Sequence, residues 1–203
     1  MTKNILYFGS KSQSRRMLLE ESQIPFVTVD QNADESQCDW GRPLPQLVLS
    51  IAIYKMQHVI LPEGTHEGQV CYVLTADTMS NDKKGVIHGK PVDRADAIAK
   101  IKAAEDGSFL CTAFCLDKKI WRAGAWVVED RVADIVFAEF IFTVPDNWLD
   151  IYLEKTPFLD VSGAIAVEKF GNQFLKTVQG SYSTIIGLPL FEVRQALEKL
   201  GFF

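Results

Sequence analysis

Residues 108–144 carry the pattern that most restricts the fold of this chain. Three strand-like runs follow one another there, at 108–117, 119–130 and 131–144, and each is rich in β-branched and aromatic residues. The short connections between them predict an antiparallel meander, because tight turns join antiparallel strands. A regular alternation of strand and helix with a wholly parallel sheet is therefore disfavoured.

The rest of the chain alternates between strand and helix patterns. Strands are predicted at 4–9, 26–29, 69–80 and 84–91, and a glycine-punctuated loop and strand at 161–182. Helices are predicted after the serine-rich turn at 10–14 and at 45–60, 93–107, 145–155 and 189–201. This mixture predicts an α/β or α+β fold with a mixed or antiparallel sheet. Because 203 residues contain no repeat or linker, we expect one domain spanning 1–203, compact or bilobed.

Charge and hydropathy exclude several classes of function. The net charge is −5, the pI is near 5.3 and no basic block exists, which argues against binding of a nucleic acid polymer. A small phosphorylated ligand is still compatible with this charge. No stretch of ~18 apolar residues predicts a membrane span, and the apolar part of the amino terminus is too short for a signal peptide. A cytoplasmic location is therefore expected.

The cysteine and histidine pattern does not predict a structural zinc site. The four cysteines include no CxxC pair, and none of the three histidines lies at finger spacing from a cysteine. Cys111 and Cys115 lie four apart in a strand-like run, so both should point to one face. We interpret the cysteines as buried, reduced thiols.

An aspartate, Asp77, lies in the middle of the strand-forming run YVLTADTMSND at 72–82. Aspartate is rare in strands, and an acidic group there costs stability unless it is paired, solvated or bound to a metal. Three interpretations are open: a satisfied structural aspartate, an edge turn, or a catalytic carboxylate at the end of a strand.

Other polar candidates are weak when taken one at a time. Lys55 falls on the apolar stripe of the helix predicted at 45–60; it either extends outward along the helix surface or reaches into a cleft. The serine-rich turn is either a helix cap with solvated arginines or a phosphate-binding turn. Together, such a turn, two lysines and separated carboxylates can hold phosphates and Mg²⁺ or Mn²⁺, or orient a water molecule.

Six short motifs carry a resemblance to a known family. In chain order they are GSKSQSRRMLLEESQIPF (9–26), DE (34–35), IAIYKMQHV (51–59), LTADTMS (74–80), HGKPVDRADAIAKI (88–101) and GSYSTIIGLPL (180–190). In this order and spacing they resemble the Maf family, the septum-formation-inhibitor-like nucleotide pyrophosphatases. The likeness runs from about Ile5 to about Leu197.

The resemblance implies an ITPase-like α/β fold, an elongated mixed β-sheet flanked by helices, with two lobes and a cleft between them. It implies hydrolysis of a nucleoside triphosphate to the monophosphate and pyrophosphate, assisted by a divalent metal cation, Mg²⁺ or Mn²⁺. A homodimer is also expected. The alternative is a nucleotide-binding Maf-like protein with little or no catalytic activity, which the altered segment described below motivates.

The resemblance also implies roles for basic and hydroxyl residues. Ser10, Ser12 and Arg15 match the phosphate-binding turn of the family and would anchor the triphosphate of the substrate. Lys55 matches the helix lysine and Lys90 the lysine of the G-K-P motif. Both lysines would stabilise charge that develops on the phosphates.

Two carboxylates and one altered segment complete the expected site. Asp77 matches the aspartate of the A-D-T motif as general base or metal ligand, and Glu35 is its acidic partner; both would be catalytic and hold the metal. The family segment D-K-A-G-A-Y-G-I-Q-G reads DVSGAIAVEKFG here, with Val161 in place of lysine and Glu168 in place of glutamine. Glu168 is expected to bind the base, either by accepting hydrogen bonds from guanine N–H groups or by attracting a methylated, positively charged ring. This favours a modified nucleotide such as 7-methyl-GTP over dTTP or UTP, and the preferred base stays open.

Overall fold

The computed structural model of the chain describes residues 4–203, so the first three residues of the predicted domain 1–203 lie outside it. The chain divides into two compact units. Unit 1 contains the residues up to Asp77 together with Ala113–Ile135 and Gly187–Phe203, and unit 2 contains Thr78–Thr112 and Val136–Ile186. Each unit is described by itself below.

The strands form one mixed sheet, which confirms the predicted mixed α/β fold. Its strand order is β2-β1-β3-β5-β6-β7, and β4 pairs with β3 outside this path. Strand β1 pairs in parallel with β2 and β3, whereas the β3–β4 and β6–β7 pairs are antiparallel. The strands are β1 (Leu6–Phe8), β2 (Phe26–Thr28), β3 (Val70–Asp82), β4 (Ile87–His88), β5 (Ser108–Arg122), β6 (Ala125–Phe142) and β7 (Leu175–Gly180).

The predicted three-stranded meander at 108–144 is wrong. The structure has two long strands there, β5 and β6, joined by one turn at Ala123 and Gly124. Both turn residues have positive φ, 50° and 77°, as a two-residue hairpin turn requires, and glycine adopts this conformation without steric cost. The predicted connections near 118 and at 130–131 therefore fall inside β5 and β6, and the actual turn falls inside the predicted middle run.

Two charged residues at the predicted connections, Asp117 and Arg131, pair across the hairpin in unit 1. The Asp117 side chain is fully buried, and its two carboxylate oxygens accept hydrogen bonds from Arg131 Nε and Nη2 over 2.6 and 2.8 Å. Lys119 Nζ lies 3.4 Å from the same carboxylate. A buried carboxylate is tolerated in a strand when it is paired and hydrogen-bonded in this way. The charges therefore continue the strands rather than ending them.

Replacing Arg131 by lysine is expected to lower the free energy of unfolding by about 1–2 kcal/mol, because a lysine keeps the charge but loses the two-pronged bond to Asp117. Chemical denaturation of the purified variant measures this. The matched control is Arg122→Lys, because Arg122 is the last residue of β5 in the same hairpin but is exposed, with its Nη2 4.0 Å from Glu129 Oε1. Equal stability of Arg131→Lys and the parent would contradict a structural role for the pair.

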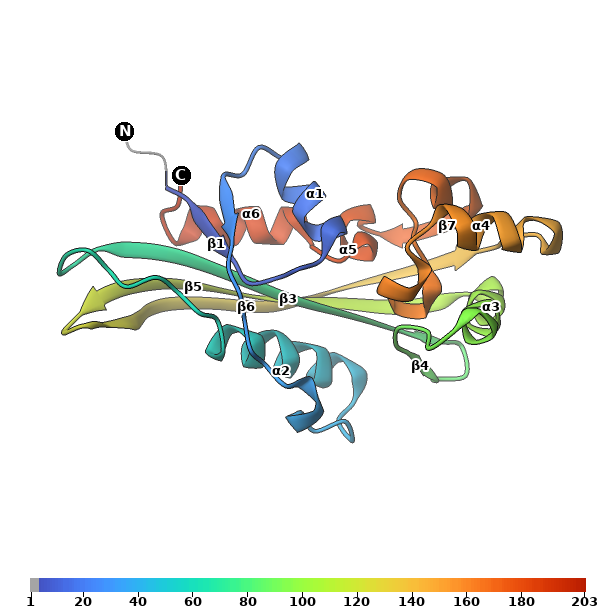
Figure 1. Cartoon of the computed structure of the whole chain (residues 1–203), viewed down its shortest axis with the longest axis horizontal. Helices are drawn as coiled ribbons and strands as arrows, with labels where there is room; N and C mark the ends of the chain where they lie inside the picture. Colours follow the sequence, from blue (N-terminus) through green and yellow to red (C-terminus); the bar gives the residue numbers. More distant parts are fainter. Residues whose placement is uncertain (1–3) are drawn as a thin grey trace. The chain divides into compact units, whose positions relative to one another are not determined.

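In unit 1 the helices pack on both faces of the strands. Helix α2 (Leu44–Gln57) lies on one face, and α1 (Gln13–Glu21) and α6 (Leu190–Lys199) lie on the other (Figure 1). Successive residues of β3 serve the two faces: Val73 belongs to the cluster that includes Met56 of α2, whereas Tyr72 donates its hydroxyl to main-chain carbonyls just after α6. This alternation explains why residues 71–74 of β3 are buried and apolar at every position.

In unit 2 one core joins the helices to the ends of the long strands. It includes Ile101 from helix α3, Phe140 and Phe142 from β6, Tyr152 from α4, and Phe174. The α-helices of this unit are α3 (Arg94–Ala103), α4 (Leu149–Lys155) and α5 (Tyr182–Ile186). Helix α5 was not predicted, whereas the other two confirm predictions.

Short 3-10 segments occur in both units. They are Glu35–Gln37 in unit 1 and Ala104–Asp106, Asp146–Trp148, Phe158–Asp160, Ser162–Ala164 and Lys169–Phe174 in unit 2.

Within residues 4–203 no helix is long and apolar enough to cross a membrane. The four cysteines, which all lie within residues 4–203, form no disulfide there. Cys71, Cys111 and Cys115 are buried, which confirms the prediction for these three, whereas Cys38 is partly exposed. Burial raises the pKa of the Cys71 and Cys115 thiols to about 12, so both stay protonated at neutral pH.

Candidate active site

Three of the predicted site residues meet in unit 1 around one ammonium group. Lys55 Nζ donates to Asp77 Oδ1 over 2.7 Å and lies 2.9 Å from Glu35 Oε1. Lys55 comes from α2, Asp77 from β3 and Glu35 from the loop between β2 and α2. The ammonium therefore joins two carboxylates that come from different elements of the fold.

Asp77 lies inside β3 and is only 6% exposed. Two of the positions proposed for it, an edge turn and the end of a strand, are therefore wrong. Burial raises the pKa of Asp77 above its ordinary value, against the lowering effect of Lys55 and Arg15. Asp77 Oδ1 is bonded to Lys55, but the buried Oδ2 has no hydrogen-bond partner among the described residues. An orphaned carboxylate oxygen is costly to bury and is a place where a ligand, water or ion can bind.

The packing of α2 on β3 decides where Lys55 points. Lys55 lies on the stripe with Ile51 and is 8% exposed, so the idea that it extends outward into solvent is wrong. Thr75 Oγ1 donates to Ala52 O of α2 over 2.8 Å, two residues before Asp77 on the same face of β3. This buried bond fixes the helix against the strand and brings the lysine to the carboxylate.

Local hydrogen bonds hold the loop that carries Glu35. Asp34 accepts from the Ser36 N–H and hydroxyl over 3.1 and 2.7 Å, and these bonds lower the pKa of Asp34. Trp40 Nε1 donates to Glu35 O over 3.1 Å. The Glu35 side chain itself stays 41% exposed, so it is accessible to a ligand.

The serine-rich turn caps helix α1. Ser12 is the N-cap residue, and its hydroxyl accepts from the Arg15 N–H over 3.4 Å; Ser10 Oγ accepts from the Ser12 N–H over 3.3 Å. The helix-cap interpretation of this turn is confirmed. The N-terminus of α1 still presents backbone N–H groups that favour an anion, so a cap and a phosphate-binding turn are compatible.

Arg15 is not solvated, contrary to the other part of that interpretation. Its Nε donates to Gly187 O over 2.6 Å and its Nη1 donates to Ala76 O over 2.8 Å. Burial lowers the pKa of Arg15, opposed by Asp77 and Glu35, but a guanidinium remains charged at neutral pH. Arg15 therefore ties the turn to β3 at the residue before Asp77, in addition to any contact with a substrate.

The donor set suits a hard divalent cation that also binds phosphate. Carboxylate oxygens are the preferred ligands of Mg²⁺, which commonly takes one or two carboxylates together with substrate phosphates. Asp77 offers its orphaned Oδ2, and Glu35 is accessible. No group of three or more histidine, cysteine or acidic residues arranged to hold a metal occurs among residues 4–203. The residues therefore fit a cation shared with a phosphorylated ligand better than an all-protein metal site.

The other two predicted site residues belong to unit 2. Lys90 is exposed, and its main-chain carbonyl accepts from Lys100 Nζ over 3.1 Å. Glu168 is half-buried at the N-cap of the segment Lys169–Phe174. Burial is the main cause that raises the pKa of the Tyr152 hydroxyl, and the negative charge of Glu168 adds a smaller increase. Val161, in place of the family lysine, is also half-buried.

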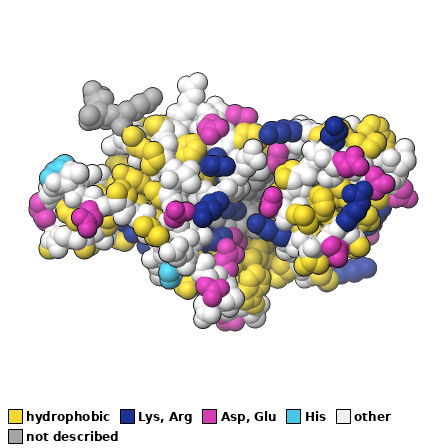
Figure 2. Space-filling view, in the orientation of Figure 1, with side chains coloured by type: hydrophobic (Ala, Val, Ile, Leu, Met, Phe, Trp, Pro, Cys, Tyr) yellow, Lys and Arg dark blue, Asp and Glu magenta, His cyan; other side chains and the backbone are white. Residues whose placement is uncertain are grey.

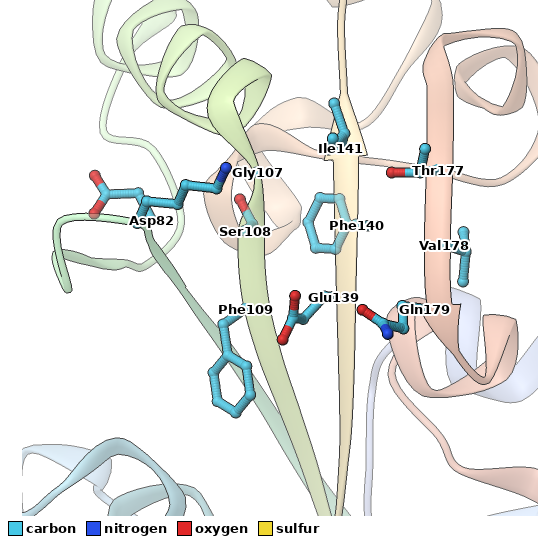
Figure 3. A pocket seen from close by; sticks show the side chains of 11 residues that line it. Asp82, Gly107, Ser108, Phe109, Glu139, Phe140, Ile141, Thr177, Val178 and Gln179 are labelled. Atoms are coloured by element: carbon cyan, nitrogen blue, oxygen red, sulfur yellow. The ribbon is translucent and has the colours of Figure 1, made fainter.

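A cavity of about 390 Å³ in unit 2 contains none of the predicted site residues (Figure 3). It lies on strands β5, β6 and β7, with Phe109, Glu139, Ile141 and Gln179 among the side chains drawn as sticks around it. Asp82, the last residue of β3, and the adjacent Lys83 also line it. The candidate active site is therefore placed at the charged cluster of unit 1, because its side chains have the chemistry that phosphate hydrolysis requires.

Basic and acidic side chains are interspersed on the face of the molecule shown in Figure 2. They are mixed with hydrophobic side chains rather than gathered into one extended basic area.

The sequence did not reveal the residues that position this site. Thr75 bonds to a residue 23 positions away, and Arg15 bonds to carbonyls 61 and 172 positions away. No local pattern reports such contacts. A hydroxyl residue two positions before Asp77 on the same strand face was the only available sign.

Comparisons with known proteins agree with the motifs. A family model described as "Maf-like protein" matches residues 5–200. A nucleoside triphosphate pyrophosphatase from Trichormus variabilis is 31% identical over 96% of this chain and 92% of its own length. Two dTTP/UTP pyrophosphatases show similar identities. That of Acholeplasma laidlawii is 30% identical over 98% of this chain and 96% of its own length. That of Anaeromyxobacter sp. is 31% identical over 97% of this chain and 89% of its own length.

Proposed function

Since the chain belongs to the family of Maf-like proteins, we propose that it hydrolyses a nucleoside triphosphate to the nucleoside monophosphate and pyrophosphate. The relatives described above are named as pyrophosphatases, and they align with almost the whole chain. The proposal makes the chain a hydrolase acting on an acid anhydride.

The observation that carries the proposal is the arrangement around Lys55. A buried ammonium lies between two carboxylates, and one of them, Asp77, keeps a buried oxygen without a partner among the described residues. A purely structural ion pair would be expected to satisfy every lone pair that it buries. Perturbed, incompletely satisfied carboxylates are typical of catalytic sites.

In the proposed reaction, water attacks the α-phosphorus, the bond from this phosphorus to the bridging oxygen breaks, and pyrophosphate leaves. Asp77 takes the proton from the attacking water. Burial raises its pKa and so makes it a stronger base than an exposed aspartate. Lys55 keeps Asp77 ionised and oriented, while Glu35 shares the positive charge of Lys55.

The triphosphate would be bound by the turn before α1 and by lysines. Ser10, Ser12 and the N–H groups at the start of α1 suit phosphate oxygens. Lys90 and Lys55 would stabilise the negative charge that builds up as the anhydride bond breaks. Arg15 holds the turn beside β3 through its bonds to main-chain carbonyls.

We further propose that Asp77 and Glu35 hold Mg²⁺ or Mn²⁺ together with phosphate oxygens of the substrate. Such an ion neutralises phosphate charge and polarises the phosphoryl oxygen when it is bound. Lys55 prevents the two carboxylates from repelling each other before the ion and substrate arrive.

The base is proposed to be modified or non-standard. Val161 offers no charge or hydrogen bond, whereas the half-buried Glu168 carboxylate can accept bonds from guanine N–H groups or attract a positively charged methylated ring. The relatives named for dTTP and UTP make those two nucleotides the necessary comparison.

Purified protein is expected to release pyrophosphate from at least one member of a triphosphate panel in the presence of Mg²⁺ or Mn²⁺. The panel contains 7-methyl-GTP, GTP, dTTP, UTP and ATP. Addition of excess EDTA is expected to reduce turnover at least about a hundredfold, since the phosphate charge is then not neutralised. Restoring the metal in excess is expected to restore the rate.

Three results would change the proposal. No turnover of any triphosphate, with tight binding in a thermal-shift screen, favours the alternative of a nucleotide-binding protein without catalysis. A preference for dTTP and UTP contradicts the assignment of a modified base but leaves the reaction intact. Turnover that is insensitive to EDTA contradicts the metal.

The oligomeric state and location follow the same family expectation. We propose a homodimer, which light scattering of the purified chain tests directly. A cytoplasmic location, where nucleoside triphosphates are made and consumed, belongs to the same proposal.

A further inference from the structure

Two neighbouring residues of unit 2, Ser162 and Gly163, bind the main chain of the loop that leads to Lys90. Ser162 Oγ donates to His88 O over 2.6 Å, and the Gly163 N–H donates to Gly89 O over 3.1 Å. Gly163 has φ 65°, a left-handed conformation that glycine adopts without steric cost. Two successive carbonyl groups of the loop are therefore held from one short segment.

The far side of the same loop is held by helix α3. Lys100 Nζ donates to Lys90 O over 3.1 Å and to Asp96 Oδ2 over 2.7 Å. The Val92 N–H donates to the same oxygen of Asp96 over 2.9 Å. The main chain around Lys90 is thus held by bonds from two other segments of unit 2, while the Lys90 side chain is exposed.

The turn between β3 and β4, which precedes this loop, is also held by hydrogen bonds. Asp82 Oδ1 accepts from the Lys84 and Val86 N–H groups over 2.8 and 3.0 Å, and Asp82 Oδ2 lies 3.1 Å from His88 Nε2. These bonds close the turn between β3 and β4 from within. Ser162 and Gly163 are different, because they reach the loop from a distant part of the chain, 74 residues away for the Ser162 bond.

The segment that supplies these bonds is the one proposed to recognise the base. Ser162 directly follows Val161, and Glu168 lies six positions further on. A displacement of this segment is therefore passed to the main chain of the Lys90 loop through two hydrogen bonds. The side chain of Ser162 contributes one of them and can be changed without altering the backbone.

We propose that Ser162 is a positioning residue for Lys90: its bond to His88 O holds the loop so that the lysine is aligned with the phosphates. The inference rests on the proposed function, because it requires Lys90 to act on the phosphates during hydrolysis.

The test is a double-mutant cycle between Ser162 and Lys90, measured as steady-state hydrolysis of the best triphosphate of the panel. Ser162→Ala is expected to lower kcat about tenfold, since small misplacements of a charge-stabilising group are costly, with KM changed less than about twofold. In the Lys90→Met background, Ser162→Ala is expected to change kcat by less than about twofold, because the group that it positions is gone. Ser162→Thr, which keeps a hydroxyl, is expected to recover most of the rate.

Thr156→Val is the matched control. Thr156 Oγ1 also donates to a carbonyl of unit 2, Tyr152 O, over 2.8 Å, and it is half-buried like Ser162, but the bond does not touch the Lys90 loop. Its kcat should stay within about twofold of the parent. Thermal melting of every variant verifies that it folds.

Two results overturn the proposal while leaving the proposed function intact. They are a parent-like kcat for Ser162→Ala, and an equal loss of kcat with and without Lys90, which would mark Ser162 as merely structural. Absence of hydrolysis by the parent protein would instead overturn the proposed function, and this inference with it.

Discussion

Asp77→Asn is expected to lower kcat at least about a thousandfold, because an amide can neither take the proton from water nor bind a cation with comparable strength. The loss should appear in kcat and in kcat/KM to a similar degree, as removal of a transition-state interaction does. Pyrophosphate release from the preferred triphosphate measures it. Rates close to the parent would show that the carboxylate has been misassigned.

The fold should survive this change. Asparagine has nearly the same shape, and its Oδ1 can still accept from Lys55, which also keeps its contact with Glu35. We expect the free energy of unfolding to change by no more than about 1–2 kcal/mol. Asp134→Asn is the control: Asp134 is an exposed aspartate of β6 in the same unit, and its bond from the Ile135 N–H is one that asparagine can keep. Its rate and stability should match those of the parent.

Lys55→Met is expected to abolish activity and to destabilise the protein by about 3–5 kcal/mol, because removal of one partner leaves a buried charge uncompensated. Both contacts of the ammonium, at 2.7 Å to Asp77 and 2.9 Å to Glu35, are lost together. Methionine fills a similar volume on the apolar stripe of α2, so the loss reflects charge more than packing. Chemical denaturation and pyrophosphate release measure the two effects.

A second substitution separates the contribution of the charge from other effects. In Lys55→Met, the additional change Asp77→Asn is expected to restore about half or more of the lost stability, because the unpaired buried carboxylate is then neutral. Activity should not return. If Asp77→Asn instead destabilises the Lys55→Met protein further, the pair is not the electrostatic unit that the distances indicate.

The metal proposal adds an independent readout for the same variant. With the ammonium gone, Asp77 and Glu35 are left as two carboxylates, and Mn²⁺ is expected to raise the melting temperature of Lys55→Met more than that of the parent. The double variant Lys55→Met/Asp77→Asn should lose this response. A melting temperature that Mn²⁺ raises equally in all three proteins would contradict binding at this pair.

The sequence predicted elements well where their signals are local. The helix at α2 was found from its apolar stripe, and β1, β2 and β3 from short apolar runs that end at glycine or polar residues. It failed at the long hairpin, because a charged residue in a strand and a charged residue in a turn look the same until the partner is known. Asp117 and Arg131 are 14 residues apart, and only the fold shows that they face each other.

For the candidate site too, the sequence predicted some features and not others. The sequence singled out Asp77 as an aspartate in a strand-forming run and Lys55 as a lysine on an apolar stripe, but it was the family resemblance that assigned them, together with Glu35, to one site. Their contacts were not predictable, since Lys55 and Asp77 are 22 positions apart and meet only after α2 packs on β3. The positioning bonds of Arg15 and Ser162 run to main-chain carbonyls, which every residue carries and no sequence pattern marks.

The amino-acid sequence by itself determined the class of fold, the family and the set of side chains that could act on a phosphate. The tertiary structure decided that Lys55 turns inward, that one oxygen of Asp77 is left without a partner among the described residues, and that Arg15 is bonded to main-chain carbonyls rather than solvated. The physical reason is that periodicity and residue type are properties of short stretches of chain. Burial and hydrogen bonding between distant residues exist only once those stretches have packed together.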